Sequence, residues 1–405
     1  MNKTTCGCLV SAFLVCLLSA SKLSAQSVHP APVMMTLNPD EVFMPGTSVL
    51  WSPAGQAAWD QMRMYHGVKA IEFDRHVPIA DVLNRFVWDA MSTLPPNTVV
   101  YGGEDSEKRR EEIRAEITKK AGANAAQMIG PFRPPGKIGP DHYRIRSALF
   151  VSCLAHAPKF PSSFSRDAKP KTFTQTNGQT LQVRGFGVER QEAANFGDAF
   201  QVLSDDLAGG YVLRLPFMSE DKAGPDCLVL AKKPGIKTLG EGMAYMRASL
   251  KTPLPALRTI KHQGQLWRYT AQLTDIDHFW MPKLKATIAC DYHELIGETY
   301  LRYIVPETGF QLYWKIIEAQ QLLNFSLDEK GAMTQMVFKV SPDFEAMGGL
   351  GGGEVLPQGV TVESLPEWPK GFKLDGPFLA ALWRKGADWP YLAVWVDSED
   401  VIDLK

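Results

Sequence analysis

The stretch IIEAQQLLNFSLDEKGAMTQMVFKV, residues 316–340, carries the pattern around which the rest of the chain is organised. Apolar side chains alternate with polar ones at Leu323, Phe325 and Leu327, which is the period of a β-strand with one buried face. An acidic turn follows, and a second run rich in strand-forming residues comes after it. The pattern favours two alternatives, a β-hairpin or a strand that leads into a mobile loop at Gly331.

Composition places the chain among globular proteins with a sizeable core. It has 405 residues, of which 45% are hydrophobic and 21% are charged. These values are typical of a folded, water-facing domain. The formal net charge of −1 gives no indication of a nucleic-acid partner or of an acidic membrane surface.

The first residues have the features of a secretory signal. Residues 1–25 combine Lys3, an apolar run at 9–20 and a small-residue ending before Gln26. No later stretch reaches the roughly 18 apolar residues of a membrane-spanning helix. We therefore expect an exported protein, periplasmic or extracellular, with no membrane span. Residues 26–45 are rich in proline and predict an extended lead-in to a single domain at 46–405.

Several segments along this domain have a recognisable character. Residues 148–154, ALFVSCL, form the continuous apolar run of a strand buried on both faces. Residues 173–183 predict a hairpin with an Asn-Gly turn. A charged helix is expected from about 105 to 120, and residues 372–379, FKLDGPFL, enter a final pair of strands.

Taken in this order, these segments and the DEKG turn resemble the serpin family. The resemblance implies an α+β fold: a serpin-like single domain with a large central mixed β-sheet, smaller sheets and a helical cap. The chain before residue 98 is tens of residues shorter than the family pattern, which leaves open whether one or two helices and a sheet strand are missing there.

The resemblance also implies a function. In serpins that inhibit, the segment after the DEKG-like turn is an exposed reactive loop that is bait for a protease, which is trapped as the loop inserts into the sheet. A reactive-type loop is thus expected at about 332–371, in a monomeric inhibitor of a serine or cysteine protease rather than an enzyme. The implied hinge comprises Glu329, Lys330, Gly331, Ala332, Thr334, Met336 and Phe338.

Two features depart from the inhibitory pattern. Met336 and Phe338 are bulky for residues that would enter a packed sheet, and each is expected to add about 1–3 kcal/mol of overpacking. The connection to residue 372 is also long. The alternative hypothesis is therefore a non-inhibitory serpin-fold protein that acts as a binding or structural module. Counting from either end of the loop gives two candidate scissile bonds, Glu345–Ala346 and Ser364–Leu365.

No other group of residues in the sequence indicates a functional site. The glycine-rich residues 348–353 are followed by EVLP, which cannot open a helix as a phosphate-binding loop requires, so they predict a flexible linker. The histidines have no metal-ligand spacing, and no G-x-S-x-G motif is present. We expect no metal and no cofactor. Three cysteines at 153, 227 and 290 are expected to be buried free thiols.

Overall fold

The computed structural model describes residues 33–404 except for several shorter segments. The segments outside the described part are 87–88, 140–141, 145, 168, 190–191, 194–195, 197–199, 219–225, 263–264, 305–310 and 346–369. All described residues belong to one compact unit, Ala31–Lys405. Helices and largely antiparallel sheets occur side by side in it, which confirms the predicted α+β class.

The elements are as follows. The helices of the described chain are α1 (Ala54–His66), α2 (Pro78–Arg85), α3 (Ala90–Thr93), α4 (Glu107–Ala121), α5 (Ala123–Ala126) and α6 (Leu239–Lys251), with a 3₁₀ turn at Glu399–Val401. The strands are β1 (Met34–Thr36), β2 (Val49–Trp51), β3 (Val99–Glu104), β4 (Gly136–Gly139), β5 (His142–Arg144), β6 (Ala148–His156), β7 (Ser165–Arg166), β8 (Lys171–Thr174), β9 (Thr180–Val183), β10 (Gly185–Val188), β11 (Gln201–Asp205), β12 (Tyr211–Pro216), β13 (Cys227–Lys232), β14 (Leu257–His262), β15 (Gln265–Thr270), β16 (His278–Pro282), β17 (Leu284–Asp291), β18 (Thr299–Ile304), β19 (Gln311–Asp328), β20 (Gly331–Glu345), β21 (Gly371–Lys373), β22 (Phe378–Trp383) and β23 (Leu392–Val396).

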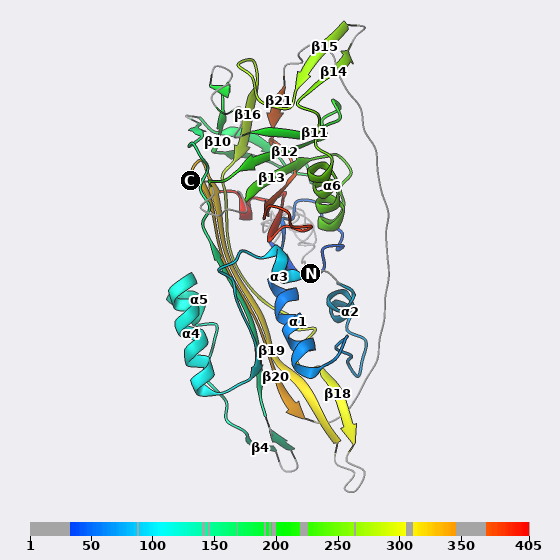
Figure 1. The fold of residues 1–405 in the computed structure, drawn as a ribbon, viewed down its shortest axis with the longest axis vertical. Coiled ribbons are helices and arrows are strands. Elements are labelled where there is room, and N and C mark those ends of the chain that lie inside the picture. Colours follow the sequence, from blue (N-terminus) through cyan, green and yellow to red (C-terminus); the bar gives the residue numbers. More distant parts are fainter. Residues whose placement is uncertain are drawn as a thin grey trace, which may run out of the picture. The chain divides into compact units, whose positions relative to one another are not determined.

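Three larger sheets organise these strands (Figure 1). A seven-stranded sheet has the order β1-β2-β23-β22-β13-β12-β11, and a four-stranded sheet the order β21-β16-β10-β7. The six-stranded sheet has the order β17-β19-β20-β6-β3, with β18 also paired to β19. Among the described strands, β1–β2 and β16–β21 pair in parallel, so the seven- and four-stranded sheets are mixed. The six-stranded sheet, which holds β19 and β20, is antiparallel. The predicted extended lead-in at 26–45 contains β1, which pairs with β2 in the seven-stranded sheet.

Residues 316–340 lie in one long hairpin. β19 and β20 pair with each other, and β20 pairs with β6 on its other side, so β20 is an interior strand. Residues 332–345 are therefore a strand in this structure, where the serpin resemblance implied the start of an exposed loop. These residues form an interior strand because successive side chains are buried on opposite faces of the sheet. Met336 belongs to the hydrophobic cluster on one face, and Val337 belongs to the cluster on the other.

Helices cover both faces of the six-stranded sheet. α1 packs on one face against β6 and β20, and α4 with α5 lies over the other face (Figure 1). α4 begins where the Ser106 hydroxyl accepts a hydrogen bond from the Arg109 backbone N–H, as an N-cap should. Its apolar stripe, Ile113 and Ile117, is buried against β6 and β20, which confirms the predicted charged helix with a narrow apolar face.

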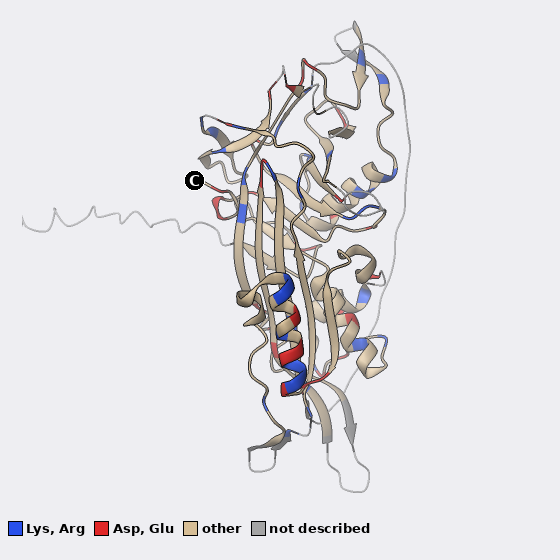
Figure 2. Ribbon diagram, turned by 60° about the vertical axis from the view of Figure 1, so that its left-hand side comes forward, with Lys and Arg blue, Asp and Glu red and all other residues tan. Residues whose placement is uncertain are grey.

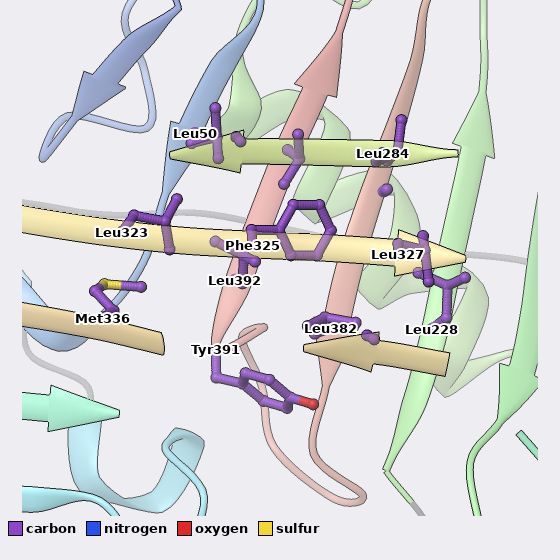
Figure 3. Packing of buried hydrophobic residues seen from close by; sticks show 14 of the residues in the cluster. Leu50, Leu228, Leu284, Leu323, Phe325, Leu327, Met336, Leu382, Tyr391 and Leu392 are labelled. Atoms are coloured by element: carbon purple, nitrogen blue, oxygen red, sulfur yellow. The ribbon is translucent and has the colours of Figure 1, made fainter. Parts of the chain in front are cut away.

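The core lies between the six- and seven-stranded sheets. Figure 3 shows leucines of β2, β13, β22 and β23 meeting side chains of β17, β19 and β20, with the strands of one sheet running across those of the other. Leu323, Phe325 and Leu327 of β19 are all buried there, which confirms the alternation read from the sequence. Two sheets that pack face to face with crossed strands enclose a core between their inner faces.

Phe338 tests how strongly β20 is integrated into this core. The Phe338 side chain is 0% exposed, so Phe338→Ala is expected to lower the free energy of unfolding by about 3–5 kcal/mol. The matched control is Met333→Ala on the same strand, where the methionine is 40% exposed, and a change within about 0.5 kcal/mol is expected. Urea denaturation measures both. Equal small effects would contradict a permanent place for β20 in the core.

Candidate functional site

The predicted hinge is the turn between β19 and β20, and it is tightly tied down. Gly331 has φ +153°, and a Cβ there would lie 2.3 Å from the Pro158 carbonyl oxygen, so only glycine fits. The backbone N–H of Ala332 donates to that same oxygen at 3.0 Å. The backbone N–H groups of Phe160 and Phe164 donate to the carbonyls of Lys330 and Glu329, both at 2.9 Å. The turn is thus fixed by the chain that follows β6.

Glu329 is the charged centre of this turn. Its side chain is almost fully buried and forms ion pairs with Arg166 and with Lys283, the latter at 2.8 Å. Burial by itself raises the pKa of this carboxyl, but hydrogen bonds from Lys283 and Arg166 outweigh burial and bring the pKa to about 2. The sequence placed Glu329 in the hinge. Its two cationic partners come from distant segments that the local pattern did not indicate.

The core-facing residues of β20 are all buried: Met336 and Phe338 lie in the core, as do the smaller hinge residues earlier in the strand. Ser152 of β6, a small residue, stands opposite Phe338 in the strand register. The Phe338 ring packs on Tyr292, with centroids 5.7 Å apart. A Cβ on Gly55 of α1 would be in ordinary contact with that ring but would lie 2.3 Å from a methyl carbon of Leu37, so the glycine makes room for Leu37. The steric cost of Met336 and Phe338 stays a prediction.

The opposite face of β20 carries charges, and each has a partner. The Lys339 ammonium lies beneath the helical layer, 3.1 Å from the Glu318 carboxylate, and donates to the Met128 carbonyl oxygen at 2.8 Å. Burial lowers the pKa of Lys339, while Glu318 opposes that change. Asp343 accepts hydrogen bonds from Arg144 and Ser147. The signal that sequence reasoning missed is a lysine inside an otherwise apolar strand.

The two ends of the following segment lie at opposite ends of the sheet. Glu345, the last residue of β20, pairs with Tyr313 near the start of β19. The chain is described again at Lys370, whose ammonium is 2.8 Å from the Asp277 carboxylate, with both side chains 0% exposed. Among the candidate scissile residues only Glu345 is within the described chain, in β20. Ala346, Ser364 and Leu365 lie outside the described residues.

Simple geometry shows that an uncut chain can join these ends. β20 has 15 residues, so its ends are roughly 50 Å apart. β21 pairs with β16, and the chain continues from β16 directly into β17. Leu284 at the start of β17 pairs with Leu327, next to the turn between β19 and β20. β21 therefore lies beyond that turn. The 24 residues 346–369 can reach roughly 80 Å when extended. The strand β20 and the paired β21 are therefore compatible in one intact molecule.

Other features of the described residues do not converge on the hinge. A pocket of about 850 Å³ is lined by side chains of both charges around Trp280, and no predicted site residue lines it. Within the described part of the chain, no cluster of histidine, cysteine and acidic residues could hold a metal ion. Cys153 and Cys227 are buried free thiols, as predicted, whereas Cys290 is half-buried. No helix of the described chain is both long and apolar enough to cross a membrane.

Comparisons with known proteins concern the fold. No family model matches the sequence, and no curated protein matches it. A cleaved serpin 42Da is similar over 86% of this chain and 89% of its own, with 12% identity and a TM-score of 0.46. The thermophilic serpin tengpin in the latent state is similar over 87% and 92%, with 12% identity and a TM-score of 0.42. A cleaved, loop-inserted ovalbumin mutant is similar over 87% and 93%, with 9% identity and a TM-score of 0.41.

The first two of these solved structures carry the name of the family that the sequence segments resemble. At such identities and TM-scores they assign no role to any residue of this chain. The strand order, the register and the contacts described above are this protein's own.

The low pKa of Glu329 predicts a specific dependence of stability on pH. Because the folded-state pKa is about 2 and the ordinary value is 4.5, the ion pairs stabilise the fold fully above the ordinary pKa. That contribution, about 3 kcal/mol, is lost as the pH falls toward 2. Glu329→Gln should be less stable than wild type at neutral pH, and the gap should close in acid. Thermal melts across this range measure it.

The matched control for this experiment is Glu111→Gln, which changes an exposed carboxylate of α4. It is expected to leave the melting temperature unchanged at neutral pH. A constant difference between wild type and Glu329→Gln down to the lowest pH would contradict the low pKa.

Proposed function

We propose that this protein is a non-inhibitory, serpin-like protein that acts by binding a partner and not by trapping a peptidase. One observation carries the proposal: in the intact chain, β20 already occupies the interior of the sheet, between β19 and β6. A trap that works by loop insertion needs an empty place in the sheet. Here the bait segment itself fills that place.

The contacts of β20 support a permanent position. Its turn forms three backbone hydrogen bonds with the chain after β6. Its buried charges at Lys339 and Asp343 have partners on neighbouring strands. Removing the strand would expose its apolar side chains and separate these ion pairs. Breaking a buried pair without a replacement is strongly unfavourable. The free energy that would drive a trap is then already realised in the resting protein.

Location and assembly belong to the same proposal. The signal-like residues 1–25 support export, to a periplasm or to the outside of a cell. The described chain closes its own core around both large sheets, which supports a monomer. The serpin resemblance implies a protein that is not an enzyme.

Proteolysis gives a direct test. Serine proteases are expected to cut the segment 346–369 and to leave two associated fragments with an unchanged melting temperature, because cleavage releases no strand that could still insert. Denaturing gels and thermal melts of intact and cleaved protein measure this. A covalent complex with a protease, or a large rise in melting temperature on cleavage, would overturn the proposal.

A charge placed on β20 distinguishes an inserted strand from an exposed loop. Thr334 is fully buried, so Thr334→Arg in the uncut protein is expected to cost several kcal/mol because the guanidinium has no partner there. Met333→Arg, at the neighbouring exposed position, is the control and should have little effect. If both variants of the intact protein melt like wild type, β20 lies outside the sheet before cleavage.

A peptidase inhibitor is the second candidate, and one observation favours it. The hydroxyls of Thr334 and Ser152 are buried with no hydrogen-bond partner among the described residues, which costs about 1–3 kcal/mol each. Of the two, Thr334 lies on β20, and its hydroxyl would be hydrated in a second state with this strand outside the sheet. In that state the hinge residues 329–338 would lead to a scissile bond at Glu345–Ala346 or at Ser364–Leu365. The covalent complex in the proteolysis experiment is its positive result.

A further inference from the structure

The last residue of α1, His66, reaches into a cluster of aromatic rings next to β18 (Figure 1). The centroid of its imidazole lies 4.9 Å from the ring of Tyr65, 6.1 Å from Phe150, 5.4 Å from Tyr300 and 4.8 Å from Trp314. These rings come from α1, β6, β18 and β19. The imidazole is half-buried between them, so a change in its charge takes place largely away from water.

Among the described residues, His66 has no acidic partner. Its polar partner there is the Tyr300 hydroxyl, 3.1 Å from Nε2. The two tyrosines are the other titratable groups of the cluster, and the charges of Glu104 and Arg146 act on Tyr65. Figure 2 shows charges of both signs along α4, whereas the sheet strands behind it are tan over most of their length. Burial lowers the pKa of His66 to about 4. An imidazolium would therefore stand unpaired among the rings.

β18 is an edge strand with an irregular pairing. Among the described strands it pairs with β19 alone, and its register shifts between Tyr300 and Tyr303. Leu301, inside this shift, has φ +53°, in the left-handed region that residues other than glycine rarely adopt. A strand with one partner and a strained residue opens more readily than an interior strand such as β20.

The chain that follows α1 closes over the other edge of β18. The Asp74 backbone N–H donates to the Thr299 carbonyl oxygen at 3.0 Å, and Nε of Arg75 donates to the Glu298 carboxylate at 2.7 Å. On the β19 side, the Ile316 backbone N–H donates to the Glu298 carbonyl oxygen at 2.9 Å. Release of β18 would break these bonds, so the amides of Asp74 and Ile316 report its position.

We propose that His66 is an acid-sensitive latch whose protonation releases β18 from β19. The imidazolium regains hydration when the Tyr300 ring moves away, and Tyr300 moves with β18 because it is part of that strand. Release leaves the edge of β19 unpaired at 311–315. An extended segment of a partner can pair with such an edge. The latch does not depend on the position of β20, and it goes beyond the proposed non-inhibitory function.

The pKa of His66 sets the direction of the pH effect. Its ordinary value is 6.5, and its value in the closed protein is about 4. The open form binds the proton more tightly, so the closed form is fully stable above the ordinary pKa and loses stability as the pH falls toward 4. From pH 7 to pH 5 the equilibrium constant for opening is expected to rise about 20-fold. The ion pairs of Glu329 are lost only below its ordinary pKa of 4.5, so the two effects are separated.

Hydrogen exchange of backbone amides measures this opening. It is followed by mass spectrometry on the intact chain and corrected for the intrinsic exchange rate at each pH. Protection at Asp74 and Ile316 is expected to fall about 20-fold from pH 7 to pH 5. The reference amide is that of Tyr292, which donates to the Ala319 carbonyl oxygen at 2.9 Å on a part of β19 that does not pair with β18. Its protection is expected to stay constant.

Two variants assign the effect to one histidine. His66→Phe keeps a ring in the cluster but cannot be protonated, so protection at the reporter amides should not change with pH. His76→Phe is the matched control, because this exposed histidine pairs with Asp81 outside the ring cluster, and it should respond as wild type does. Circular dichroism checks that both variants are folded.

Three outcomes would overturn the latch. The first is constant protection of the reporter amides in the wild type between pH 7 and pH 5, a result that decides even if His66→Phe does not fold. The second is the same fall in His66→Phe as in the wild type. The third is an equal fall at Tyr292, because this would indicate opening of the whole sheet.

Discussion

The interior position of β20 is the constraint on which the rest of the six-stranded sheet depends. From Met336 to Asp343 every side chain of β20 is buried, because the strand is paired on both edges and covered on both faces. Phe338 therefore requires a small residue opposite it, and Ser152 provides it. Lys339 requires an acid and a carbonyl group beneath the helical layer, and Glu318 and Met128 provide these. The surroundings of β20 are adapted to its presence.

This adaptation links the fold to the proposed function. Because β20 is already in the sheet, its insertion can release no further free energy. A fold that could drive a conformational change by inserting a strand therefore stays in one conformation here. Chain length makes this possible, because the segment 346–369 is long enough to connect the far end of β20 with the buried Lys370–Asp277 pair without a cut. The departure that the sequence showed as extra loop length is thus a structural requirement of the intact state.

The sequence by itself determined the strands of the central hairpin, the glycine turn between them and the charged helix α4, because these follow from local periodicity, capping and turn chemistry. The α+β class came from the resemblance to the serpins. The hinge residues came from the same resemblance, and their role stays a prediction. It could not determine whether 332–345 lies in the sheet or outside it, since an alternating apolar pattern suits both. Tertiary structure decided this through residues remote in sequence: Ser152 stands opposite Phe338, Arg166 and Lys283 hold Glu329, and Glu318 neutralises Lys339. Packing volume and burial of charge are properties of the assembled sheet, and no local stretch of sequence contains them.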